Sequence, residues 1–323
     1  MKTRTHRLVA GVVLTAAVAV PFSCASLPKL PPSGFVEPPA ATTPLEICWI
    51  ETGGASVSGG LGAGGVTSAS TWEVTTSALL VRHPQGALLI DTGLSLDAAE
   101  EAKELGGWKR FVFGQTAGRN AVRGNLRALL EGLDATRLTA IVLSHAHADH
   151  MGGVSQLPNV PVWLAAEEAA FVEADLKLQG GVVIPAQARS IAGRTVGLRF
   201  ESGPYLNYPK SHDVFGDGAV VIVPTFGHTP GSVATFINVP GKRVVHVGDL
   251  INLRESIDRE VPKSKVMRAM TDEDAHATDV EVARLVELHR VAPDVQILPA
   301  HDRAQWERLF GPTPVGAPPP CAR

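Results

Sequence analysis

A mainly apolar segment runs directly into a cluster of histidines, and this junction constrains the fold more than any other part of the sequence. Residues 138–143 (LTAIVL) predict a strand that is buried on both faces. The next seven residues are SHAHADH, which place three histidines and an aspartate within six positions. The end of a buried strand is where a loop is held rigidly toward a cleft. The sequence therefore predicts an α/β protein with a functional loop at this strand end.

The spacing within this loop favours metal binding. In an extended loop, residues two apart point the same way, so His145 and His147 can bind one ion together. Asp149 and His150 turn toward a second point, and the intervening alanines add no bulk. A purely structural role would explain one of these histidines but not all three.

Four further motifs also combine a hydrophobic strand with polar residues at its end. They are LIDTG at 89–93, TFGHTPGS at 225–232, VGD at 247–249 and LPAHD at 298–302. Together with the histidine loop, they resemble the five motifs of the metallo-β-lactamase superfamily, in the family's order, over residues 87–302. This resemblance implies an αββα sandwich, with two mixed sheets flanked by helices. The motifs are specific for the fold and not for a substrate.

The resemblance also implies a set of ligands for two metal ions. The first ion would be bound by His145, His147 and His228, the second by Asp149, His150 and His301, and Asp249 would bridge them. Nitrogen and oxygen ligands with a bridging carboxylate suit two zinc ions, with iron, manganese and cobalt as alternatives. Asp91 of the first motif is expected to hydrogen-bond the histidine loop and orient its ligands.

Such a centre predicts hydrolysis. Two neighbouring cations lower the pKa of a shared water, and the bridging hydroxide attacks a substrate carbonyl, while Asp149 or Asp249 moves the proton. The spacing from His150 to His228 and then to Asp249 resembles N-acyl homoserine lactonases and related lactone or ester hydrolases.

One position departs from the lactonases. They carry a tyrosine three residues after the bridging aspartate, where this chain has Asn252. Tyr205 and Tyr208, in the insertion of residues 165–214, are candidates to replace it, and that insertion is expected to shape the pocket.

Other functions stay open. An exported metallo-β-lactamase or a thioester hydrolase is the alternative enzyme, although zinc β-lactamases with this loop usually lack an aspartate at the position of Asp249. A non-hydrolytic iron enzyme, such as a persulfide dioxygenase, or a metal-binding protein without turnover is a further alternative. The expected partner is a small molecule, because a net charge of −3 and 5% aromatic residues argue against nucleic acid. The oligomeric state is left open.

The N-terminus predicts export. Basic residues precede a short apolar run at 8–20, so residues 1–25 resemble a signal peptide, and Cys24 fits a lipoprotein-type site for a lipid anchor. The protein is thus expected to be periplasmic or anchored to a membrane as a lipoprotein. A proline-rich tether at 26–44, a catalytic domain at 45–311 and a proline-rich tail at 312–323 would follow. In an oxidising compartment, Cys48 and Cys321 are predicted to form a disulfide.

Local patterns predict several other elements. Residues 53–65 are expected to form a glycine-rich loop that could cover an active site. Residues 60–65 match G-x-G-x-x-G, but a strand rather than a helix follows, which argues against a dinucleotide site. Apolar spacing predicts helices at 95–105, 120–133 and 272–290.

Overall fold

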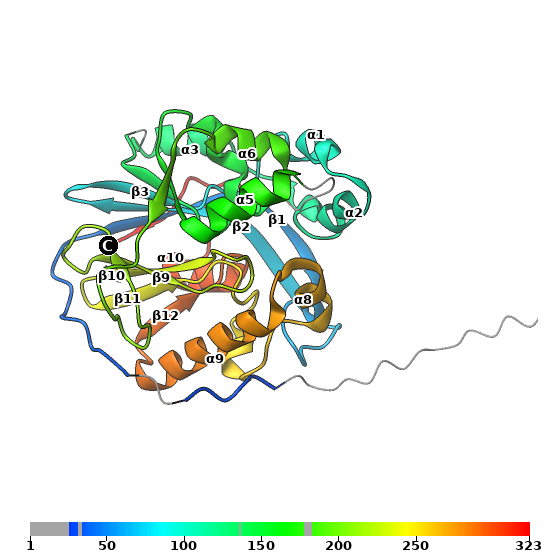
Figure 1. Cartoon of the computed structure of the whole chain (residues 1–323). Coiled ribbons are helices and arrows are strands. Elements are labelled where there is room, and N and C mark those ends of the chain that lie inside the picture. The colour runs from blue at the N-terminus through cyan, green and yellow to red at the C-terminus, as the bar shows by residue number, and fades with distance from the viewer. Residues whose placement is uncertain (1–25, 32–33, 136, 178–182) are drawn as a thin grey trace, which may run out of the picture.

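A computed structural model of the chain describes residues 26–31, 34–135, 137–177 and 183–323. The predicted signal peptide and the anchor at Cys24 lie outside these residues. Two β-sheets face each other, and helices cover the outer face of each (Figure 1). The αββα sandwich expected from the sequence is therefore confirmed.

The first sheet has eight strands and is mixed. Its order is β13-β1-β2-β3-β5-β6-β7, with β4 paired to β1. The pairs β3–β5, β5–β6 and β6–β7 are parallel. The pairs that β1 forms with β13, β2 and β4 are antiparallel, and so is the β2–β3 pair. The bounds are β1 Glu46–Ser58, β2 Thr71–His83, β3 Gly86–Ile90, β4 Ala121–Val122, β5 Ala140–Val142, β6 Val162–Ala165, β7 Thr195–Leu198 and β13 Cys321–Ala322.

The second sheet has five strands in the order β12-β11-β10-β9-β8. Only β11 and β12 are parallel, so this sheet is mixed as well. The bounds are β8 His212–Asp213, β9 Val220–Pro224, β10 Val233–Val239, β11 Lys242–His246 and β12 Val295–Leu298.

The helices form the outer layers and the rim. α3 (Leu126–Gly132), α5 (Ala166–Lys177) and α6 (Pro185–Ile191) cover the first sheet, and α9 (Ala275–Val291) covers the second (Figure 1). The remaining helices are α1 Ala98–Glu101, α2 Gly107–Gln115, α4 Ala148–Met151, α7 Glu255–Asp258, α8 Lys265–Thr271 and α10 Arg303–Phe310.

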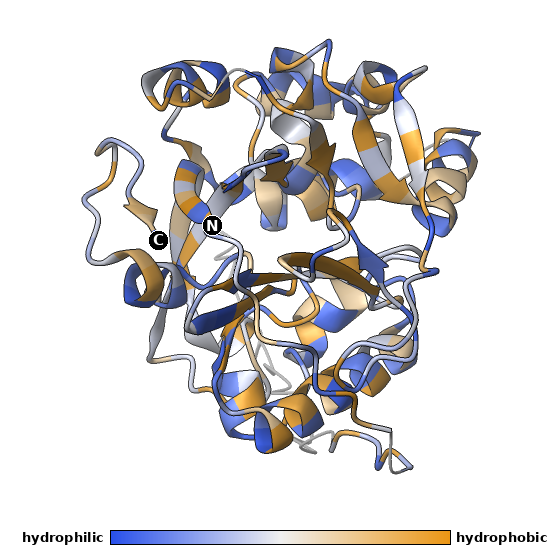
Figure 2. Ribbon diagram, turned by 90° about the vertical axis from the view of Figure 1, so that its left-hand side faces the viewer, coloured by the Kyte–Doolittle hydropathy of each residue, from blue (hydrophilic) through white to orange (hydrophobic). Residues whose placement is uncertain are grey.

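The central strands are buried on both faces because their residues alternate between two cores. In β5, Ala140 and Val142 belong to the core between the sheets, whereas Ile141 packs under the helices of the first sheet. In β9, Ile222 faces the same central core and Val223 faces the α9 side. Figure 2 shows strands coloured mainly as hydrophobic and outer helices that alternate between the two colours. This two-faced burial explains why the strands read as nearly continuous apolar runs.

The two ends of the domain are tied together. Cys48 and Cys321 form the predicted disulfide, which joins β1 to the C-terminal strand β13. On the N-terminal side, Val36 pairs with Leu206 in an antiparallel bridge. Within the part of the chain that the structure describes, no helix is long and apolar enough to cross a bilayer.

Two local expectations were wrong. Residues 53–58 are not a loop, because they continue β1 and pair with β2 up to Thr71, past an irregularity between Glu51 and Gly53. The helix expected from residue 120 begins only at Leu126, because Asn125 caps it and β4 pairs with β1 instead. Residues 60–65 lie in the turn between β1 and β2, which supports the argument against a dinucleotide site.

Candidate metal centre

The seven side chains expected to bind metal converge at one edge of the sandwich. His145 and His147 follow β5, and Asp149 and His150 lie on the short helix α4. The remaining three, His228, Asp249 and His301, follow β9, β11 and β12. Each group sits just past the end of a buried strand, which fixes its position.

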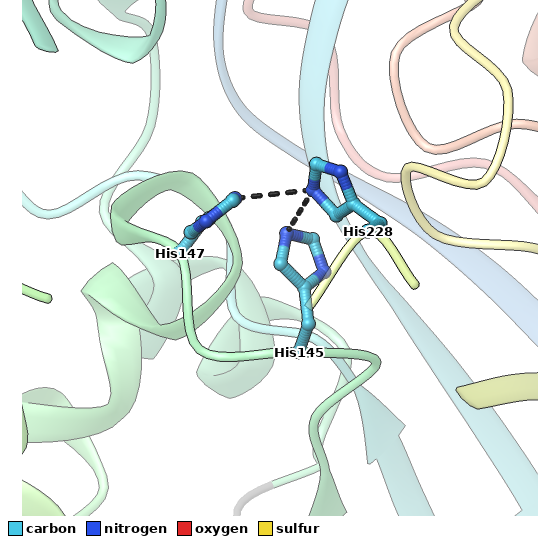
Figure 3. A group of neighbouring side chains, drawn as sticks. All are labelled: His145, His147 and His228. Atoms are coloured by element: carbon cyan, nitrogen blue, oxygen red, sulfur yellow. Dashed lines mark hydrogen bonds between the residues drawn. The ribbon is translucent and has the colours of Figure 1, made fainter. Parts of the chain in front are cut away.

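Three histidines form the first group (Figure 3). The Nε2 atom of His228 lies 3.2 Å from Nε2 of His145 and 3.1 Å from Nδ1 of His147. The rings of His145 and His147 meet that of His228 at 80° and 85°, so their edges rather than their faces point to a common centre. Three nitrogen atoms so arranged are suited to bind one ion.

The second group lies beside the first. Nε2 of His150 is 3.2 Å from Nε2 of His301, and Asp149 Oδ2 is 3.4 Å from the latter atom. Asp249 Oδ1 lies 3.2 Å and 3.1 Å from the same two nitrogens, while its Oδ2 is 3.7 Å from His228 Nε2. Asp249 therefore stands between the two groups, where a bridging carboxylate would have to be.

The histidines are held through their other ring nitrogens. Nδ1 of His150 contacts Asp91 Oδ2 at 2.8 Å, and Nδ1 of His301 contacts the carbonyl oxygen of Thr75 at 2.8 Å. Nδ1 of His228 contacts Asp272 at 2.8 Å. Such partners fix the tautomer and direct the opposite nitrogen to an ion, as in known metal sites. The donor set therefore fits a pair of divalent cations.

Asp91 contacts the histidine loop, as expected from its motif. Its fully buried carboxylate accepts hydrogen bonds from the backbone nitrogen and the hydroxyl of Ser144, at 2.7 Å and 2.8 Å, besides contacting His150. Burial raises the pKa of Asp91, but the charges of His150 and His246 and the hydrogen bonds from His150 and Ser144 together lower it below the ordinary value. The carboxylate is therefore charged at neutral pH.

The electrostatics of the two groups differ. Burial, reinforced by neighbouring imidazoles, lowers the pKa of His145 and of His147 well below the ordinary value. Burial also lowers the pKa of His150 and His301, but nearby carboxylates, Asp249 foremost, together outweigh it and raise both. The first pair is thus neutral, the form that binds metal, whereas in the second group protons and cations compete.

Three buried charged residues support the centre and were missed from the sequence. The carboxylate of Glu168 on α5 accepts from the backbone nitrogens of Ala146 and Gly231, so it links the first histidine loop to the loop of His228. Lys263 forms a fully buried ion pair with Asp272 and donates to the carbonyl of Asp249 at 2.7 Å. No sequence motif marks these residues, because their partners are distant in the chain.

A largely apolar pocket opens over the centre. His147, Asp149, Asp249, Asn252 and His301 line it on one side. Its walls come from the β1–β2 hairpin, from residues 105–113 and from α8, and include Val57, Leu61, Trp72, Val74, Leu105, Val112, Phe113, Met267 and Met270.

The insertion 165–214 affects the pocket only indirectly. None of its described residues lines the pocket, but Ile184 packs in one cluster with Leu105 and Ala148, which do. The expectation about the two tyrosines was wrong. Tyr205 and Tyr208 are buried against Phe236, in the core on the α9 side of the second sheet. They therefore do not stand in for the tyrosine of the lactonases.

The fold and the paired donor groups define a two-sheet protein with a candidate dinuclear metal centre. The family model described as "Metallo-beta-lactamase superfamily" matches residues 71–301. The chain belongs to this superfamily and is by class a metal-dependent hydrolase.

Two known proteins are similar to this chain in sequence. A probable metallo-hydrolase of Mycobacterium bovis is 28% identical over 250 residues, which cover 69% of this chain and 73% of that protein. The N-acyl homoserine lactonase AttM of Agrobacterium fabrum is 24% identical over 173 residues, 53% of this chain and 63% of its own.

Solved structures agree with this fold. An N-acyl homoserine lactone hydrolase with N-hexanoyl-L-homoserine bound at its catalytic metal centre superposes with a TM-score of 0.61 and 20% identity, over 83% of this chain and 96% of that one. The dizinc quorum-quenching lactonase AidC gives a TM-score of 0.56 and 19% identity, over 83% and 90%.

Proposed function

We propose that this protein is a dinuclear metal-dependent hydrolase that cleaves a lactone or ester bond. The observation that carries the proposal is the convergence of the seven side chains expected to bind metal beside an apolar pocket. His145, His147 and His228 would bind one ion, and Asp149, His150 and His301 the other, with Asp249 between them. Zinc fits these nitrogen and oxygen donors, and iron, manganese or cobalt would compete for them.

Bound ions would supply Lewis acidity and lower the pKa of a water molecule at the site. The protein's own residues would hold the ions and transfer the proton. Burial raises the pKa of Asp249, yet His301 and His150 lower it well below the ordinary value, so it stays charged as a ligand. Asp149 has an exposed fraction of 9% and faces the pocket, where its carboxylate can accept the proton of the attacking water and pass it to the leaving alkoxide.

Asn252 is positioned to contact the substrate. It lines the pocket beside Asp249 and His301, and its exposed fraction is only 2%. Its Nδ2 atom is buried and has no hydrogen-bond partner among the described residues. A buried amide without a partner is costly, which supports a role as donor to the substrate carbonyl oxygen.

The apolar walls support a substrate with a hydrophobic part attached to its carbonyl. The likeness to N-acyl homoserine lactonases supports a lactone of this kind as the first candidate. A β-lactam is the second candidate, favoured by the predicted export of the chain, and a thioester is the third.

The test is proton release by the zinc-loaded protein with an N-acyl homoserine lactone, an aryl ester and a thioester, beside a carbapenem followed by absorbance. We expect lactone or ester turnover that Asp249→Ala abolishes and that Asp294→Ala, which removes an exposed carboxylate paired with Arg243, leaves unchanged. A protein that binds two zinc ions and turns over none of these carbonyl compounds would contradict the proposal.

We further propose that the protein is exported and acts in the periplasm, free or as a lipoprotein anchored through Cys24. The disulfide between Cys48 and Cys321 supports an oxidising compartment. Mass spectrometry of the N-terminal peptide from the native host tests this. A mature chain that begins at Cys24 with an acyl group indicates the anchored form, one that begins at Ser26 the free form, and an intact Met1 refutes export.

A further inference from the structure

Helix α2 exposes two large aromatic side chains. Trp108 is 67% exposed and Phe111 is 52% exposed, and their rings stack with centroids 5.0 Å apart. Exposed tryptophan of this extent is uncommon on a soluble surface, because the indole ring contributes a large apolar area. The next face of the same helix is inward, since Val112 is buried and Phe113 lines the pocket.

The segment around this aromatic pair is basic. Residues 106–122 contain Lys109, Arg110 and Arg119 and no acidic residue. Neither Lys109 nor Arg110 forms an ion pair with any residue that the structure describes.

The acidic residues that precede α2 have other partners. Glu104 forms an ion pair with Arg189 of α6, and Glu101 accepts hydrogen bonds from Ser95 and Gln187. Neither of these two acidic residues therefore forms an ion pair with Lys109 or Arg110.

The helix also forms part of the pocket entrance. Lys109 and Val112 line the pocket, as do Met267 and Met270 of α8 across it. Figure 1 shows α2 and α8 on the same side of the molecule, with α2 above α8. α8 adds an exposed apolar side chain, Val266, which is 53% exposed.

We propose that α2 is an interfacial helix that docks this side of the protein on an anionic lipid surface. Tryptophan and phenylalanine insert at the boundary between headgroups and acyl chains, while lysine and arginine contact the phosphates. Docking in this way turns the pocket entrance to the membrane, so that an amphiphilic substrate can enter from the lipid. The lipid contact goes beyond the proposed hydrolysis and is tested without it.

A second copy of the chain fits this surface less well. A twofold dimer through α2 would bring Lys109 and Arg110 of one copy against the same residues of the other, with no acidic residue in 106–122 to pair with them. An anionic lipid surface complements both features, because its interfacial region accepts the aromatic pair and its phosphates pair with Lys109 and Arg110.

The experiment is flotation of the zinc-loaded full chain carrying Cys24→Ser, with vesicles of phosphatidylcholine with and without phosphatidylglycerol. Cys24→Ser prevents acylation, and any contribution of residues 1–25 is the same in every variant. Phe111→Ala is compared with Phe35→Ala, which removes a phenyl ring that is 39% exposed in the N-terminal segment. Arg110→Gln is compared with Arg308→Gln, an exposed arginine on α10.

We expect Phe111→Ala to lower partitioning into both vesicle types by about tenfold, the factor given by burial of part of a phenylalanine side chain. Arg110→Gln should lower it about fivefold on vesicles that contain phosphatidylglycerol and little on phosphatidylcholine alone. Both control variants should partition like the parent. Equal partitioning of Phe111→Ala and the parent would overturn the proposal. So would gel filtration that shows a parent dimer which Phe111→Ala dissociates, since α2 would then bind a second copy.

Discussion

Replacing Asp91 by asparagine should weaken the second metal position far more than the first. Asp91 accepts two hydrogen bonds from Ser144, at 2.7 Å and 2.8 Å, and contacts His150 Nδ1 at 2.8 Å. Asparagine keeps one acceptor oxygen, but its amide group would face one of these donors, and the negative charge beside His150 is lost. His150 belongs to the second group and contacts Asp91 directly, whereas in the first group Asp91 is linked only to His145, through the Ser144 hydroxyl 3.1 Å from His145 Nδ1.

The expected magnitude follows from the role of such partners. Loss of a carboxylate that orients a metal-binding histidine lowers metal affinity by about 10- to 100-fold, or about 1.4–2.7 kcal/mol. Competition with a chelator, read by the zinc content of the protein at each free zinc concentration, resolves the two affinities. One of the two affinities should fall by this factor in Asp91→Asn, and the other should change much less.

A matched control separates this effect from a general loss of stability. Asp217→Asn removes a carboxylate that also contacts a buried histidine, His83, at 2.9 Å, but outside the pocket. It should leave both zinc affinities unchanged. The reasoning is refuted if Asp91→Asn weakens both ions equally, or neither, while its thermal unfolding stays cooperative.

Three further predictions follow from the same structure. Glu168→Gln should destabilise the protein by about 1–3 kcal/mol in urea unfolding, because the buried carboxylate joins two loops through hydrogen bonds; an unchanged midpoint would show that the loops do not depend on it. Burial lowers the pKa of His246 to about 4, so its neutral form is favoured in the folded state. Above about pH 6.5 this histidine does not lower the free energy of unfolding. As the pH falls from about 6.5 toward 4, the free energy of unfolding declines by about 1.4 kcal/mol per pH unit, because the unfolded state binds the proton more tightly. His246→Gln should therefore reduce the loss of stability between these pH values, and identical pH profiles would contradict this. Asn252→Ala should lower kcat on the best substrate by about 100-fold with both zinc ions retained, whereas an unchanged kcat would exclude a contact with the developing negative charge.

The sequence predicted the residues that lie in recognisable motifs and the disulfide, and could not predict contacts between segments that carry no motif. Each of the metal-binding motifs contains both a strand and the polar residues at its end. The sequence therefore predicted both the identity of His228, Asp249, His301 and the histidine loop and their place at strand ends. The pocket walls could not be predicted from the sequence, because the β1–β2 hairpin, α2 and α8 meet only in the folded chain.

The errors have the same origin. Residues 121–122 have helical spacing, but the edge of β1 offers them backbone hydrogen bonds, and the cap of Asn125 starts the helix later. Tyr205 and Tyr208 were candidates for the site by their place in the chain, yet burial in the core behind the second sheet takes them away from it. Lys263 gave no signal, because a buried lysine is recognised only by its partner Asp272.

The most direct test of the two-ion centre is a crystal structure of the zinc-loaded protein with anomalous diffraction at the zinc absorption edge. The account predicts two peaks per chain, one among His145, His147 and His228 and one among Asp149, His150 and His301, with Asp249 between them. Anomalous peaks elsewhere on the protein, or fewer than one zinc ion per chain at this site, would contradict it.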